Sequence, residues 1–126
     1  MNDLPRKLLW IDSLGGLAVG VLMFALTGWL TDWYQLPKNF LYLMGAANLA
    51  YGSYSFFLAR RSTRPLVLIQ LLALANLTWM VLCLWWTFHY RDTANVFGLA
   101  HLVIEGLYVG GLGCVEWRLR KQLLTA

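Results

Sequence analysis

Four long apolar runs constrain this sequence more than any other feature. They cover residues 8–30, 39–59, 65–88 and 95–117, and each is close to the roughly 20 residues that a helix needs to cross the hydrocarbon core of a bilayer. Backbone groups in lipid must be hydrogen-bonded within their own element, and the runs lack strand-like alternation, so we expect helices. Short connections then predict an all-α, polytopic membrane protein: an antiparallel bundle of four transmembrane helices forming one domain over residues 1–126.

The composition leaves no room for a soluble domain. Of the 126 residues, 60% are hydrophobic and only 13% are charged, against about 25% charged in soluble proteins. The first run is longer than the apolar region of a signal peptide, so we interpret it as a retained helix. The cations are split among short segments, which argues against a nucleic-acid partner and leaves the lipid bilayer as the surroundings.

The distribution of Lys and Arg predicts the orientation. Eight of the ten fall on one side of the map: Arg6, Lys7, Arg60, Arg61, Arg64, Arg118, Arg120 and Lys121. The other two, Lys38 and Arg91, have Asp32 and Asp92 near them. The positive-inside rule therefore places both termini in the cytoplasm and the loops 31–38 and 89–94 outside, as in a multi-pass protein of a bacterial inner membrane.

Aromatic residues gather near the expected membrane boundaries. Most belong to the external side, namely Trp29, Trp33, Tyr34, Trp85, Trp86 and Tyr90, and two to the cytoplasmic side, Trp10 and Trp117. Such belts anchor helices at the headgroup level. An aromatic cage for a cationic ligand is the alternative use of the outer set.

Polar residues inside the apolar runs mark the candidate site, because charge at bilayer depth is costly. Asn48, Asn76 and Glu105 each fall within about two residues of the middle of a run, which at 1.5 Å per residue is roughly 3 Å. His101 and Tyr108 lie four before and three after Glu105, so the three share one helix face. Tyr51 shares a face with Asn48 in the same way.

Glu105 allows two interpretations. In the functional one, it belongs to a small occluded polar site, carries a proton or meets a cationic group, and His101 relays from the external side. In the structural one, it is protonated, hydrogen-bonded to Asn48 or Asn76, and holds helices together by about 0.6–2 kcal/mol.

Asp12 lies only a few residues inside the cytoplasmic boundary. We expect an interfacial ion pair with Arg6, Lys7 or the 60–64 loop. If water enters the bundle from the cytoplasm, Asp12 and Glu105 instead form a two-step proton path.

Small residues recur on two helices at a spacing that permits close helix approach. Gly16 and Gly20 form such a stripe on the first helix, and Gly106, Gly110 and Gly113 form one on the fourth. We expect the first and last helices to pack together through them, with dimerisation as the alternative.

No pattern of catalytic or metal-binding residues accompanies these features. Cys83 and Cys114 form no CxxC pair, and the two histidines are not spaced as helix-borne ligands, so we expect no metal and no cofactor. A nucleophile set and a phosphate loop are also lacking, so an enzyme is the less favoured interpretation.

Several short segments together resemble the small four-span bacterial inner-membrane proteins of unassigned function. They are Leu9-Trp10-Ile11-Asp12, Leu36-Pro37, Ala75-Asn76-Leu77-Thr78-Trp79 and Glu105. The resemblance spans most of the chain and implies no activity.

Three functions follow from these observations. The leading one is a membrane protein whose site around Glu105 binds or passes a small solute or proton, as a homo-oligomer because four helices enclose little volume. The second is an accessory subunit of a larger membrane assembly, with the glycine stripes as its docking surface. The third is a membrane enzyme acting on lipid or quinone, which requires water access and an opening to lipid beside His101.

Overall fold

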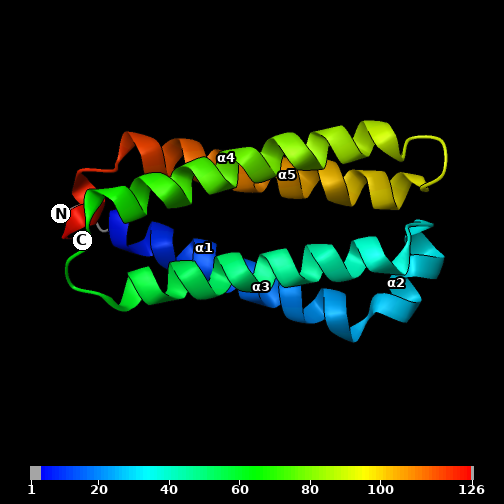
Figure 1. Ribbon diagram of the computed structural model, residues 1–126, viewed down its shortest axis with the longest axis horizontal. Coiled ribbons are helices and arrows are strands. Elements are labelled where there is room, and N and C mark those ends of the chain that lie inside the picture. Colours follow the sequence, from blue (N-terminus) through cyan, green and yellow to red (C-terminus); the bar gives the residue numbers. More distant parts are fainter. Residues whose placement is uncertain (1–3, 126) are drawn as a thin grey trace.

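The computed structural model describes residues 4–125, with side chains from Lys7 onward, and its regular structure is entirely helical. Figure 1 shows the long helices lying side by side, with a short helix at one end of the molecule. The elements are α1 (Leu4–Ala25), α2 (Thr27–Tyr34), α3 (Lys38–Arg60), α4 (Leu66–His89), α5 (Val96–Arg118) and the 3-10 turn η1 (Gln122–Leu124). The start of α1, η1 and the α3–α4 link share one end of the molecule, which we call the terminal end; α2 lies at the other, which we call the α2 end.

The length of the first apolar run predicted one helix, but the structure has two. The helix breaks at Leu26, whose φ and ψ are −109° and 15°. The Thr27 hydroxyl donates to the carbonyls of Met23, at 2.5 Å, and Phe24, at 3.2 Å, and such bonding back along a helix bends it. Residues 31–34, expected in an external loop, therefore belong to α2.

The long helices form two hairpins, α1 with α3 and α4 with α5 (Figure 1). The glycine stripes lie inside them. A Cβ atom built on Gly16 would meet backbone atoms of α3 at 3.0 Å, and one on Gly20 would meet Leu49 of α3. On α5, atoms of α4 lie within 3.0 Å of Cβ positions built on the three stripe glycines, Gly106, Gly110 and Gly113. The expected packing of the first helix on the last through these stripes is therefore wrong, because each stripe faces its own hairpin partner.

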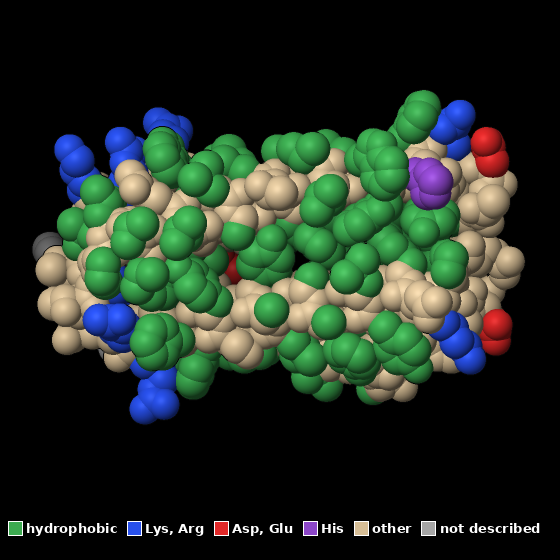
Figure 2. Space-filling model, viewed as in Figure 1, with side chains coloured by type: hydrophobic (Ala, Val, Ile, Leu, Met, Phe, Trp, Pro, Cys, Tyr) green, Lys and Arg blue, Asp and Glu red, His purple; other side chains and the backbone are tan. Residues whose placement is uncertain are grey.

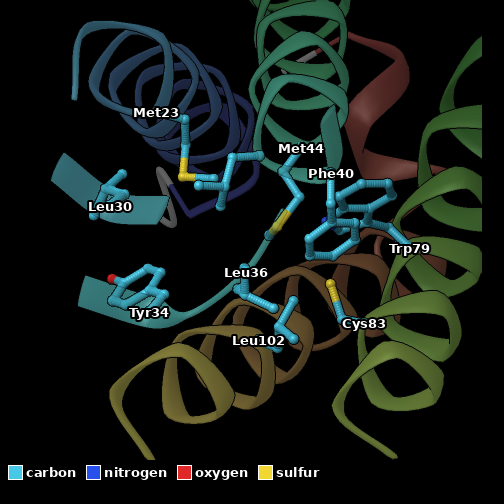
Figure 3. Packing of buried hydrophobic residues seen from close by; sticks show 10 residues of the cluster. Met23, Leu30, Tyr34, Leu36, Phe40, Met44, Trp79, Cys83 and Leu102 are labelled. Carbon is cyan, nitrogen blue, oxygen red and sulfur yellow. The ribbon is translucent and has the colours of Figure 1, made fainter. Parts of the chain in front are cut away.

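Two apolar clusters join the hairpins, one at each end of the molecule. At the α2 end, α2 and the following link insert between the hairpins, and side chains from all five helices meet there (Figure 3). At the terminal end, the buried set is Leu8, Leu9, Leu58, Ala59, Ile69, Leu72 and Leu123. Arg64 is 4% exposed and donates to the carbonyls of Leu58, Ala59 and Leu123, which fastens the α3–α4 link to η1.

Among the described residues, three helices are long and apolar enough to cross a membrane: α1 over Lys7–Ala25, α4 and α5. Helix α3 has the same length as α5, 23 residues, but carries more polar residues and is not among them. The fourth span expected over 39–59 is therefore not confirmed. The side chains around the middle of the molecule are mainly apolar in the view of Figure 2, whereas charged residues gather at its two ends.

Candidate ligand-binding cleft

Between the two end clusters the hairpins separate and leave a cleft of about 530 Å³. Its walls come mainly from α1 and α5, and its floor from α3 and α4. On the α3–α4 flank the hairpins are tied by hydrogen bonds, because Tyr51 and Tyr54 donate to the carbonyls of Ala75 and Leu68, both at 2.8 Å. On the α1–α5 flank the lining residues Phe97 and Ile104 are 55% and 67% exposed, so the cleft opens there.

Glu105 is the centre of one polar cluster in this cleft, although only 8% of its surface is exposed. Its Oε2 atom accepts hydrogen bonds from Nε1 of Trp79 at 2.6 Å and from Nδ2 of Asn48 at 3.2 Å. The other oxygen, Oε1, lies 3.0 Å from Nε2 of His101. Three helices therefore contribute partners to one carboxyl group.

His101 extends this cluster toward α2. Its Nδ1 atom lies 3.1 Å from the hydroxyl of Tyr34, the last residue of α2. Burial, and secondarily the charge of Glu105, raises the pKa of Tyr34 above 10.0, so its hydroxyl keeps its proton. Because either imidazole nitrogen can carry the proton, the chain Tyr34–His101–Glu105 has the geometry of a proton relay.

A second polar cluster lies nearer the terminal end. Nδ2 of Asn76 donates to Oδ2 of Asp12 at 2.9 Å and to Oε1 of Glu116 at 2.7 Å. Asp12 is 5% exposed, Asn76 1% and Glu116 0%. Asp12 and Asn76 line the same cleft as Glu105.

These positions change two expectations about the site. Asn48 or Asn76 was expected to bind Glu105; Asn48 does so, whereas Asn76 binds Asp12 and Glu116. Asp12 was expected in an ion pair at the interface; its hydrogen-bond partner among the described residues is the Asn76 amide, while the side chain of Arg6 lies outside them.

The two tyrosines of the expected site line the cleft, and their hydroxyls bind backbone carbonyls rather than Glu105. The Tyr51 hydroxyl donates to the carbonyl of Ala75, and the Tyr108 hydroxyl lies 3.4 Å from the carbonyl of Ile11. Tyr108 thus bridges α5 to α1 beside the opening.

Three participants were missed by reasoning from the sequence. Trp79 and Tyr34 were assigned no role at Glu105, and Tyr34, expected in an aromatic belt, is 8% exposed and turned inward. Glu116 had a signal: it follows Glu105 by 11 residues, about three turns, so both lie on one face of α5.

No group of three or more His, Cys, Asp or Glu side chains that could hold a metal occurs within residues 4–125. Comparisons with protein-family models, curated proteins and solved structures gave no match. The fold and cleft therefore support only the class of a helical protein with three candidate membrane spans.

Proposed function

We propose that this chain is a four-span inner-membrane protein whose cleft binds a small amphiphilic molecule through a cationic group at Glu105. Helix α3 supplies the fourth span in this proposal, because 23 residues extend about 35 Å at 1.5 Å per residue, enough to cross the hydrocarbon core. Two of its polar residues, Asn48 and Ser55, are buried against other helices, so they do not meet lipid.

The charge distribution supports cytoplasmic termini. Eight Lys and Arg residues were expected on the cytoplasmic side. The side chains of seven of them are described, and all seven belong to the terminal end, while Lys38 and Arg91 lie near the α2 end. Figure 2 shows acidic side chains beside the basic ones at the α2 end. This asymmetry fits the positive-inside rule.

The cleft carries the functional proposal. A volume of about 530 Å³ lies within the range of small-molecule sites, which are mostly apolar with few polar groups. Two carboxyl groups, those of Asp12 and Glu105, line the cleft, and the basic side chain of His101 is hydrogen-bonded to Glu105. An acidic cleft with an apolar lining suits a lipophilic cation, which enters from the bilayer between α1 and α5.

The cleft also bears on the other hypotheses. It opens beside His101, which is one of the two features that a membrane enzyme acting on lipid or quinone requires, so that function moves from third to second candidate. The accessory-subunit hypothesis loses its docking surface, because the glycine stripes are covered by neighbouring helices. Since the cleft lies within one chain, binding does not require a homo-oligomer.

Binding of tetraphenylphosphonium, a lipophilic cation, to the protein in lipid nanodiscs tests the proposal by equilibrium dialysis. Glu105→Gln removes the charge and should weaken binding about 10- to 100-fold, since a hydrogen-bonded or paired buried charge contributes about 1.5–3 kcal/mol. Asp92→Asn, at an exposed carboxylate, is the matched control and should bind as the wild type does. Equal affinities for all three proteins would overturn the proposal, whereas binding of neutral triphenylphosphine oxide with no effect of Glu105→Gln would favour the second candidate.

A further inference from the structure

The cluster of Asp12, Asn76 and Glu116 contains more hydrogen-bond acceptors, the carboxyl oxygens, than the Asn76 amide can donate to. One amide nitrogen, Nδ2 of Asn76, donates to both carboxyl groups. The remaining oxygen of Glu116, Oε2, is buried and has no hydrogen-bond partner among the described residues. A buried acceptor without a donor is costly, and a charged one more so.

Among the described side chains, the hydrogen bond to each of these two carboxyl groups comes from a neutral amide and not from a cation. Asp12 and Glu116 accept hydrogen bonds from the same amide nitrogen of Asn76, at 2.9 and 2.7 Å, so the two carboxyl groups are neighbours. Tyr51 of α3 and Tyr108 of α5 line the cleft together with Asp12. Tyrosines are uncharged near neutral pH. Glu105, the next carboxyl group, is 11 residues away on α5, about 16 Å along its axis.

We infer that Asp12 and Glu116 form a proton-binding site, separate from Glu105, that holds one proton shared between the two carboxyl groups. A proton on one carboxyl supplies the missing donor and removes one of two like charges on neighbouring carboxyl groups. Asn76 then donates to the remaining negative charge. Because Asp12 lines the cleft, the proton can exchange with water that enters it.

This inference goes beyond the proposed function and does not depend on it, because the site holds its proton in the ligand-free protein. Even if no cation binds at Glu105, the shared proton stays in place. The reverse also holds, so failure of either proposal leaves the other standing.

Infrared spectroscopy of the protein in lipid nanodiscs tests the site through the C=O band of protonated carboxyl groups. The starting protein is Glu105→Gln, which removes the contribution of Glu105. Apart from the chain terminus, its carboxyls outside the site are Asp3, Asp32 and Asp92, and the two described ones are exposed. Carboxyls in water are ionised near neutral pH.

We expect the band near neutral pH with the intensity of one carboxyl group, and a shift in D₂O without unfolding. Adding Glu116→Gln should abolish it, because the new amide donates to Asp12 and leaves that carboxylate ionised. Adding Asp92→Asn should leave it unchanged. Absence of the band in Glu105→Gln, or its persistence with Glu116→Gln, would overturn the inference.

If Glu116→Gln does not fold, Asp12→Asn replaces it. Removal of the shared proton then leaves Glu116 with two amide donors, from residues 12 and 76, and the band should again be lost. Size-exclusion profiles establish which variants are folded, and the first spectrum needs neither substitution.

Discussion

The hydrogen bonds around Glu105 make a quantitative prediction about two substitutions of similar size. Glu105→Leu removes the acceptor for Trp79 Nε1, whose hydrogen bond to Glu105 is its one bond among the described contacts. The Asn48 amide has two N–H groups on Nδ2. One still donates to the carbonyl of Met44 at 2.9 Å, and the other loses its acceptor, Glu105. Each buried donor without a partner costs about 1–3 kcal/mol, so the two together predict a loss of about 2–6 kcal/mol in unfolding free energy.

Glu105→Gln should cost much less. A single oxygen of Glu105 accepts from both Trp79 and Asn48, and the oxygen of a glutamine amide can take its place. The amide nitrogen then faces Nε2 of His101, which accepts if the imidazole proton moves to Nδ1 and is donated to Tyr34. We therefore expect a loss below about 1.5 kcal/mol, the net value of a typical hydrogen bond.

Reversible chemical unfolding in mixed detergent micelles measures both variants against the wild type. Glu105→Leu should unfold at clearly lower denaturant concentration, and Glu105→Gln close to the wild type. Equal destabilisation by the two variants would refute the reasoning, since it would mean that the hydrogen bonds to Oε2 do not hold the helices.

Two further predictions concern helix packing and orientation. Gly113→Ala places a methyl group 2.9 Å from the backbone carbonyl of Ala73, whereas the methyl group of Gly111→Ala meets nothing within 4 Å. In thermal unfolding in detergent we expect Gly113→Ala to lose about 1–3 kcal/mol of unfolding free energy and Gly111→Ala to lose none. Equal melting temperatures for the two variants would contradict the packing argument. In a background without native cysteines, Thr93→Cys should react in intact cells with an impermeant thiol reagent and Ser62→Cys should react only after lysis; labelling of Ser62→Cys in intact cells would reverse the orientation.

The sequence predicts the long helices well because lipid-crossing length and apolar composition act locally. The second to fourth runs end within one residue of α3, α4 and α5. The break at Leu26 could not be predicted because no proline lies there. It occurs beside Thr27, whose hydroxyl forms its hydrogen bonds to the preceding turn only in the folded chain. The membrane topology stays a prediction, as does the resemblance to four-span bacterial proteins.

The partners of Asn76 could not be predicted from depth alone. Counting from the middle of each run placed Asn76 and Glu105 at one level, but the register of the α4–α5 hairpin decides which residues face each other. Gly113 lies opposite Asn76, with 3.1 Å between its built Cβ and that of Asn76. This register brings Asn76 to Glu116 and leaves Glu105 to Trp79, one turn further along α4. Whether these residues bind a ligand is a prediction that the experiments above address.

The way η1 fastens the hairpins has a consequence for the order of assembly during synthesis. Helices α1 and α3 pair through glycines that lie entirely within the first 60 residues, so this hairpin can form while α4 and α5 are still being translated. Arg64 and the 0%-exposed Leu123 join the link between the hairpins to η1. The cleft is therefore closed at its terminal end only after residues 122–124 have left the ribosome, and chains interrupted before that point should retain two paired hairpins without a defined cleft between them.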